Sequence, residues 1–170
     1  MWDERVRIDQ EAIERFVESE YVRVVAAVAM VADSLALAEE AVQEALARAW
    51  ERGRRGHEVE SLPRWVVTVA LNVARSARRR RRLEASVGWS PAPAVPAPES
   101  AVDIARAVSA LPLRQRQAVV LHYYLDLDVA ETARTLGVSP GTVKTALHRA
   151  RRTMAVRLGD AEEVTFGGQD

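Results

Sequence analysis

Apolar residues recur along this chain at helical spacing, and we find no convincing alternation of the kind that predicts strands. The predicted helices span roughly residues 11–31, 35–52, 63–83, 100–110, 113–125, 128–136 and 139–158. Short polar or glycine-containing stretches separate them. The pattern therefore predicts an all-α protein.

The first three helices each have a predicted buried side. These sides are formed by Ile13, Phe16, Val17, Val24 and Val28; by Leu35, Ala38, Val42, Ala45, Leu46 and Ala49; and by Trp65, Val66, Val69 and Val73. Asp33 and Ser34 are expected to cap the second helix, and residues 53–62 are expected to form a loop. Trp50 and Trp65 lie beside apolar positions, so we expect both in the core.

A proline-rich stretch divides the helices into two groups. It holds Pro91, Pro93, Pro96 and Pro98 among alanine, serine and valine, a composition typical of flexible linkers. We therefore expect two small helical domains, residues 1–84 and 100–158, joined by a Pro/Ala-rich linker at 85–99 and followed by an acidic tail at 159–170. Each domain is small for independent stability, so docking on a partner would help both.

The last two predicted helices carry the most specific local signals. Asp128 is a good N-cap, and Glu131 three residues later completes a capping-box pattern. Gly137 can adopt the left-handed conformation that ends a helix. Ser139 and Pro140 then suit the N-cap and first position of the next helix. This order predicts a helix-turn-helix.

The second helix of this unit has one apolar stripe and a basic face. The stripe consists of Val143, Leu147, Ala150 and Met154. The opposite faces carry Thr142, Lys144, Thr145, His148, Arg149, Arg151 and Arg152. Such a helix can dock by its stripe and offer donors to a major groove. The alternative is an ordinary amphipathic helix with a solvated basic face, but capping, turn and charge all agree with DNA reading.

Composition excludes several classes of protein. The chain has no cysteine, which excludes disulfides, zinc-thiolate sites and thiol catalysis by this chain. The longest apolar run, residues 24–32, is too short to span a bilayer, and nothing resembles a signal peptide. We therefore expect a cytoplasmic protein without membrane insertion.

The formal net charge of zero hides a strong segregation of charge along the chain. Residues 61–83 hold seven arginines and no acidic residue, and residues 129–158 are also strongly basic. Residues 1–60 and the tail at 159–170 are acidic. Two basic segments indicate two polyanion contacts, and the acidic N-terminal part indicates a different, basic partner.

Two polar faces of the first domain are candidate interfaces. The second helix shows Glu39, Glu40, Gln43 and Glu44 on its outer side, and the third helix shows Asn72, Arg75, Ser76 and Arg79. The acidic face can also be explained as the solvent-exposed side of a surface helix, with acidic residues placed favourably near its N-terminus. The arginine run at 78–82 is either a solvated helix end or a set of phosphate contacts.

No catalytic or metal site is predicted. The acidic face lacks a nearby histidine or a glycine-rich phosphate cradle, so general acid–base or metal chemistry is disfavoured. The histidines His57, His122 and His148 lie far apart without metal-ligand spacing. We expect no enzyme activity and no cofactor. Trp2 and Trp89 lie in expected flexible segments and have no assigned role.

Three segments together resemble the extracytoplasmic function (ECF) type of bacterial RNA polymerase sigma factor, in the sigma-70 family. The family's polymerase-binding helix of region 2 resembles residues 38–50, AEEAVQEALARAW. Its −10 reading and opening helix resembles residues 62–82, LPRWVVTVALNVARSARRRRR. Region 4, which binds the −35 element, resembles residues 110–154. The motifs have the family's order and separation, with regions 2 and 4 only.

The resemblance implies a role for each candidate residue. Glu39, Glu40, Gln43 and Glu44 would face the clamp-helix coiled coil of core RNA polymerase. The −10 element would be contacted by Asn72, Arg75, Ser76 and Arg79, and an extruded base would be held by the loop that includes His57, Glu58 and Ser61. The −35 groove would be read by Thr142, Lys144, Thr145, His148 and Arg149, with Arg151 and Arg152 nearer phosphate.

The resemblance also implies partners and a mechanism. The factor would join core polymerase, place two DNA readers on promoter DNA and capture unpaired −10 bases, so that the duplex opens. An anti-sigma factor is implied as a further partner, and the protein would be nucleoid-associated when bound to polymerase. The sequence departs from the family at Gly56, often aromatic, and Ser76, often acidic, so it predicts no particular −10 sequence.

A second functional class stays open at this point. A helix-turn-helix transcriptional regulator could bind an operator without substituting for sigma. Such a regulator would usually show a phosphate-acceptor α/β pattern or a ligand pocket in its first domain, and neither is visible in this sequence.

Overall fold

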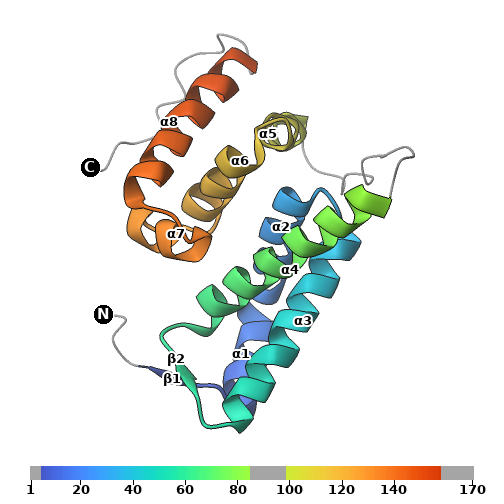
Figure 1. Cartoon of the computed structure of the whole chain (residues 1–170), viewed down its shortest axis with the longest axis vertical. Helices are drawn as coiled ribbons and strands as arrows, with labels where there is room; N and C mark the ends of the chain where they lie inside the picture. The colour runs from blue at the N-terminus through green and yellow to red at the C-terminus, as the bar shows by residue number, and fades with distance from the viewer. Residues whose placement is uncertain (1–4, 85–98, 158–170) are drawn as a thin grey trace.

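The computed structural model describes residues 5–84 and 99–157, which form two helical units packed against each other (Figure 1). The first unit contains β1 (Val6–Arg7), α1 (Gln10–Ser19), α2 (Tyr21–Ala32), α3 (Leu35–Arg54), β2 (Glu58–Val59) and α4 (Leu62–Glu84). The second contains α5 (Glu99–Ser109), α6 (Leu113–Val119), the π-helical turn η1 (Val120–Tyr124), α7 (Val129–Leu136) and α8 (Pro140–Arg157). The expected all-α fold is confirmed.

Some expectations fall on residues outside those described. They are Trp2, Trp89, residues 85–98 of the expected linker, and the acidic tail at 159–170. Within the described ranges, none of the helices is both long and apolar enough to cross a membrane.

The first unit is held together by the packing of α2, α3 and α4. Small side chains dominate the buried side of α3, where Ala38, Ala41, Ala45 and Ala49 have no solvent exposure. The buried side of α4 is also partly small, with Ala70 and Ala74 beside larger residues. Small residues allow helices to approach closely, so each helix turns one full side inward and leaves its polar side exposed.

The first predicted helix is in fact two helices, which corrects the expectation of one helix at 11–31. Glu20 separates α1 from α2 with φ −119° and ψ −20°, and its N–H donates to the carbonyl of Phe16 at 2.8 Å. Phe16 is buried, as expected. Val17, expected in the core, is 48% exposed, because it lies about 100° further around α1 than Phe16.

The expected loop at 53–62 contains a strand, which the sequence pattern missed. Val6 pairs with Val59 and Arg7 with Glu58 in an antiparallel two-stranded sheet. Two residues per strand are too few to leave a visible alternation. The pairing brings the N-terminal segment against the turn that leads into α4 (Figure 1).

Two residues expected in the core of α3 are instead at the surface. Leu35 is 43% exposed, because Leu37 occupies the inward position of the first turn. Trp50 is 42% exposed, because it follows the buried Ala49 by one residue and so lies about 100° further around the helix. Ser34, rather than Asp33, caps α3, and its hydroxyl accepts a hydrogen bond from the N–H of Leu37 at 3.2 Å.

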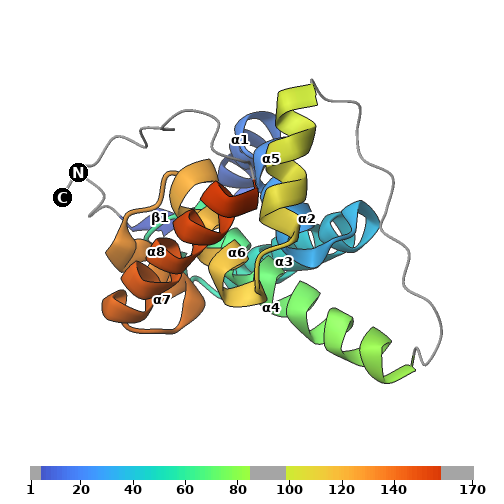
Figure 2. The same cartoon turned by 90° about the horizontal axis from the view of Figure 1, so that it is seen from above.

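The second unit is built around its last helix. The stripe of α8 packs inward, with Val143, Leu147 and Ala150 fully or almost fully buried. These residues share a core with Leu111 and Leu121, which come from the segments on either side of α6. α6 and α7 both contact α8, so α8 is supported by its helix-turn-helix partner α7 and also by α6 (Figure 2).

Gly53 near the end of α3 tests how closely the N-terminal segment packs. A Cβ at this position would lie 2.0 Å from the backbone oxygen of Ile8, so Gly53→Ala forces that segment away from α3. We expect the free energy of unfolding to fall by about 1–3 kcal/mol. Urea denaturation followed by circular dichroism measures this change.

Gly141→Ala is the matched control for this prediction. Its Cβ would meet only the Ser139 hydroxyl, at 3.8 Å, so the same substitution in α8 is sterically allowed. We expect this variant to be as stable as the parent or more stable by up to about 1 kcal/mol. A Gly53→Ala protein that behaves like Gly141→Ala would contradict the close packing of Ile8 on α3.

Candidate polymerase and nucleic-acid interfaces

The acidic face of α3 is exposed along two turns. Glu39, Glu40, Gln43 and Glu44 are all solvent-exposed, while Ala38, Ala41, Val42 and Ala45 between them are buried. The Arg48 Nε donates to Glu44 Oε1 at 2.8 Å, an exposed pair one turn apart that contributes little to stability. A rigid helix thus presents three carboxylates and an amide, an arrangement suited to a basic protein surface.

The candidate DNA-contacting residues of α4 lie on one continuous face. Asn72, Arg75, Ser76 and Arg79 are exposed and follow each other at intervals of three, one and three residues. The opposite face of α4 is buried through Val66, Val67, Ala70, Leu71 and Ala74. Toward its C-terminal end the helix extends away from the other helices of the unit (Figure 2). An accessible helix face with donors at helical spacing can contact bases and phosphates.

The loop residues lie at the other end of α4. His57 and Glu58 are exposed, and Glu58 also pairs with Arg7 in the small sheet. The Ser61 hydroxyl accepts a hydrogen bond from the N–H of Arg64 at 3.4 Å, which helps to start α4. Eighteen residues of helix place Ser61 about 27 Å from Arg79. The structure therefore arranges these candidates as an elongated surface rather than a pocket.

The basic face of α8 is fully accessible. All seven candidates, Thr142, Lys144, Thr145, His148, Arg149, Arg151 and Arg152, are exposed. Two of them also serve the helix itself. The Thr142 N–H donates to the Ser139 hydroxyl at 3.2 Å, and the Thr145 hydroxyl donates to the Gly141 carbonyl at 2.9 Å. Charged donors therefore project from a helix whose first turn is well capped.

The predicted local geometry of the helix-turn-helix is confirmed. The Asp128 carboxylate accepts from the N–H of Glu131 at 2.7 Å, and the Glu131 carboxylate accepts from the N–H of Asp128 at 2.9 Å. Gly137 ends α7 with φ 65°, in the left-handed region. Ala133 is 3% exposed, and its carbonyl accepts from the N–H of Val138 at 3.0 Å. These contacts fix the angle between α7 and α8.

Sequence reasoning missed a charged cluster between the two units. Asp33 ends α2 with φ 58°. Its Oδ1 accepts from Nη1 of Arg116 on α6 at 2.5 Å, and its Oδ2 lies 3.2 Å from Nη2 of Arg78 on α4. Arg116 is 6% exposed. One signal was available in the sequence: Arg116 lies three residues after Leu113, on the apolar side of a predicted helix. A charge buried at such a position requires a partner of opposite charge.

Two further ion pairs connect the units. Arg64 at the start of α4 pairs with Glu131 of α7, and both side chains are largely buried. Arg23 of α2 donates to Asp126 Oδ2 at 2.6 Å and to the carbonyl of Tyr124 at 2.8 Å, in an exposed position. We call these two ion pairs, together with the Asp33 cluster, the interunit seam. It joins α2 and α4 of the first unit to α6, α7 and the segment before α7 in the second.

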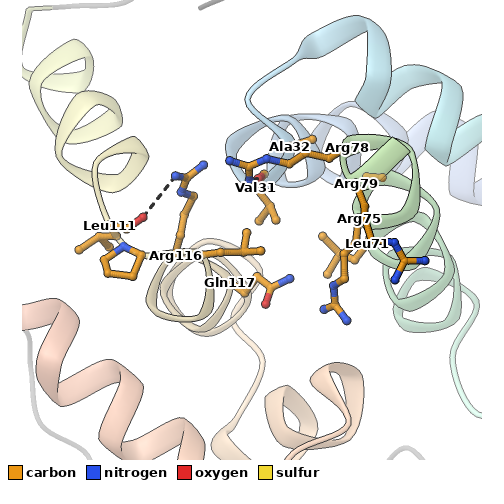
Figure 3. A pocket seen from close by; sticks show the side chains of 12 residues that line it. Val31, Ala32, Leu71, Arg75, Arg78, Arg79, Leu111, Arg116 and Gln117 are labelled. Carbon is orange, nitrogen blue, oxygen red and sulfur yellow. Dashed lines mark hydrogen bonds between the residues drawn. The ribbon is translucent and has the colours of Figure 1, made fainter. Parts of the chain in front are cut away.

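An open cavity of ≈ 460 Å³ lies along the seam. Figure 3 shows Arg75, Arg78 and Arg79 along α4 on one side of it and Leu111, Arg116 and Gln117 on the other. Its walls also include Val31, Ala32, Leu71, Ala74, Pro112 and Leu113. One side of the candidate DNA-contacting face of α4 therefore borders the second unit.

Over residues 5–84 and 99–157 the structure brings together no group of three or more histidine and acidic side chains that could hold a metal. His57 and His148 are exposed on different units. His122 has a local role, since its Nδ1 lies 2.7 Å from the carbonyl of Leu127, next to the start of α7. The described side chains thus offer exposed polar faces on α3, α4 and α8.

Comparisons with known proteins agree with this arrangement. Residues 16–84 match the family described as Sigma-70 region 2, and residues 101–154 match Sigma-70, region 4. The ECF RNA polymerase sigma factor SigL of Mycobacterium tuberculosis is 35% identical over 133 residues, covering 72% of this chain and 75% of SigL. The ECF RNA polymerase sigma factor SigF of Caulobacter vibrioides is 30% identical over 129 residues, covering 73% and 72%.

Two solved structures share the fold. The sigma factor RpoE of Bartonella quintana, in complex with the anti-sigma factor NepR, aligns with a TM-score of 0.78 over 91% of this chain and 100% of RpoE. CnrH, in complex with the cytosolic domain of CnrY, aligns with a TM-score of 0.65 over 91% and 92%. Both are 21% identical to this chain. By its matches to both sigma-70 regions and to curated relatives, the chain belongs to the ECF group of the sigma-70 family of bacterial RNA polymerase sigma factors.

Proposed function

We propose that this protein binds core RNA polymerase and directs it to promoters through a −10 and a −35 element. The observation that carries the proposal is the placement of three exposed polar faces on three well-packed helices. α3 presents an acidic face, α4 a face of asparagine, serine and arginine, and α8 a basic face. The family implies one partner for each.

The acidic face of α3 would bind the clamp helices of the largest polymerase subunit. The carboxylates of Glu39, Glu40 and Glu44 would provide complementary charge, and Gln43 a hydrogen bond. Because this face belongs to a helix packed on two others, it would be held rigid before polymerase binds.

The face of α4 would contact the −10 element. Asn72 and Ser76 carry donors and acceptors that suit base edges, while Arg75 and Arg79 suit phosphates or guanine. The segment with His57, Glu58 and Ser61 would hold an extruded base about 16 Å from Asn72 along the helix axis. Base extrusion costs a few kcal/mol, which the polymerase and DNA contacts would offset.

The basic face of α8 would enter the major groove of the −35 element. Lys144, Thr145, His148 and Arg149 lie one turn apart in pairs and would reach base edges, with Thr142 at the first turn. Arg151 and Arg152 would lie nearer the phosphates. All described steps are binding steps, so the factor would act without a catalytic residue or cofactor.

The two readers would act as separate units, residues 1–84 and 100–158, joined by residues 85–99 and followed by a tail at 159–170. A stretch of 15 residues reaches about 50 Å when fully extended. Joining the readers in one chain raises the effective concentration of the second contact once the first has formed. The protein would act in the cytoplasm, on the nucleoid, where polymerase works.

An anti-sigma factor is a proposed further partner. Both aligned structures are complexes with another protein: the sigma factor RpoE with the anti-sigma factor NepR, and CnrH with the cytosolic domain of CnrY. Run-off transcription with core polymerase and a genomic promoter pool tests the function as a whole. Specific initiation that depends on this chain would support the sigma role, whereas DNA binding without initiation would favour the helix-turn-helix regulator.

We predict that reversing charge on α3 weakens polymerase binding. Glu40→Arg combined with Glu44→Arg replaces attraction to a basic surface by repulsion, so the Kd for core polymerase should rise at least tenfold, about 1.4 kcal/mol. Glu14→Arg combined with Glu18→Arg on α1 is the matched control, with the same spacing, exposure and change in charge. Equal retention of core enzyme by both variants and the parent would count against the assignment.

We predict that Lys144→Ala or Arg149→Ala weakens −35 recognition. Loss of a base contact should cost about 1–3 kcal/mol on the cognate duplex while barely changing affinity for a scrambled one. Arg157→Ala, exposed in the last turn of the same helix, removes the same charge outside the candidate face. Footprinting at several salt concentrations measures both effects, and an unchanged footprint at the −35 element would refute the role.

A further inference from the structure

We propose that the N-terminal strand β1 extends the −10 interface, and that Arg5 and Arg7 bind phosphates of the unpaired DNA strand beside the extruded base. The inference rests on the proposed function of α4 and of the loop at 57–61. It adds two DNA contacts from a segment outside the helices that carry the other candidate residues.

β1 lies directly beside the loop that would hold the base. Val6 pairs with Val59 and Arg7 with Glu58 in the antiparallel sheet, at the end of the unit where α4 begins (Figure 1). Residues opposite each other in such a pair point to the same side of the sheet, with Cβ atoms about 5 Å apart. The Arg7 side chain therefore leaves the sheet on the same side as Glu58.

The arginines of β1 face solvent, and the apolar residues that alternate with them face the core. Arg5 and Arg7 are exposed, Val6 is half-buried against the core, and Ile8 is buried. Strand residues two apart share a side, so both arginines lie on the outer side of the sheet. Neither forms an ion pair with another residue that the structure describes. Both guanidinium groups are therefore accessible to an anion.

Packing holds β1 in place on the first unit. Ile8 lies so close to α3 that a Cβ on Gly53 would be 2.0 Å from the Ile8 carbonyl oxygen. Asp9 then caps α1, and its Oδ1 accepts from the N–H of Ala12 at 2.9 Å. The strand is thus tied to α3 by close contact and to α1 by its cap. Its arginines would be in position before DNA arrives, which lowers the entropic cost of binding.

The loop itself lacks the positive charge that a DNA strand requires. Residues 57–61, with the sequence HEVES, contain two carboxylates and no lysine or arginine. Arg64, the first arginine of α4, is 20% exposed and pairs with Glu60 and Glu131. Glu58 and Glu60 would repel a phosphate brought to the loop, because both carry charge of the same sign. The arginines of β1 would offset this repulsion.

The arrangement of the elements gives the DNA strand a continuous path. A base is extruded by rotation about its backbone, so the phosphates on either side of it lie near the loop. The face of α4 from Asn72 to Arg79 leads away from the loop in one direction, and β1 lies on the other side of the loop (Figure 1). A strand that follows α4 and delivers a base to the loop would therefore continue along β1.

The first test maps which nucleotides lie near β1. The chain has no cysteine, so Arg5→Cys, Ser76→Cys and Val17→Cys each provide one attachment site for an iron chelate that cleaves nearby DNA. Each labelled chain is then assembled with core polymerase on a promoter recovered by run-off transcription. We expect the Arg5→Cys protein to cut the unpaired strand beside the −10 bases and the Ser76→Cys protein to cut within the −10 element. The label at Val17, exposed on α1, should give neither cut.

The Ser76→Cys protein separates failure of this inference from failure of the proposed function. Cleavage at −10 from Ser76→Cys without cleavage from Arg5→Cys would overturn the role of β1 and leave the sigma assignment intact. Absence of −10 cleavage from both proteins, together with absence of specific initiation by the parent chain, would overturn the proposed function and the role of β1 with it.

The second test measures the charge of the contact. Arg5→Ala combined with Arg7→Ala should raise the Kd of the holoenzyme roughly fivefold for the same promoter with a mismatched, already unpaired −10 element. The slope of log Kd against log salt should fall by about 1.4, since each phosphate neutralised on a single strand contributes about 0.7. Arg5→Lys combined with Arg7→Lys should keep the slope of the parent, because a phosphate accepts either cation.

Two variants with the same loss of charge are the controls. Arg15→Ala with Arg106→Ala removes two exposed arginines from α1 and α5 and should leave the Kd unchanged. Arg54→Ala with Arg55→Ala removes two exposed arginines at the end of α3, just before the loop, and should cost less than the β1 variant. An equal loss from the first control would show a general charge effect, and a loss confined to the second would place the contact on α3. Either result, or an unchanged Kd in the β1 variant, would overturn the role of β1.

Discussion

Close packing of small side chains between the helices of region 2 is the constraint on which the candidate interfaces depend. The inward side of α3 is formed largely by alanines without solvent exposure, and α4 adds Ala70 and Ala74. Helices with such surfaces can approach to about 8 Å, and each then has only one side left for solvent. The acidic face of α3 and the polar face of α4 are consequences of this packing, because the residues between them are committed to the core.

The same constraint connects recognition with stability. A candidate face on a packed helix is already in position before its partner arrives, which lowers the entropic cost of binding. The helix-turn-helix achieves this with local contacts instead, through the Asp128–Glu131 capping box and the left-handed Gly137. Region 2 therefore orients its binding residues mainly by long-range packing, and region 4 orients α8 largely by its turn.

The interunit seam places charge where a surface helix would ordinarily be solvated. Arg78 belongs to the arginine run of α4, which suggests phosphate binding, yet in this structure its guanidinium faces Asp33. The side of α4 that carries Arg75 and Arg79 likewise borders region 4. One helix thus contributes to the core, to the proposed DNA surface and to the contact between the units.

The sequence by itself determined the helical class, the approximate helix positions and the caps of α7 and α8. Each of these depends on residues within one or two turns of each other, and such spacing is visible in a linear pattern. The two sigma regions were identified from the sequence by resemblance to a known family. Only the tertiary structure decided the break at Glu20, the exposure of Trp50, the pairing of Val6 with Val59 and the partners of Asp33. Asp33 and Arg116 are 83 residues apart. A contact between such distant residues leaves no periodic trace in the chain, because it forms only when the two units pack against each other.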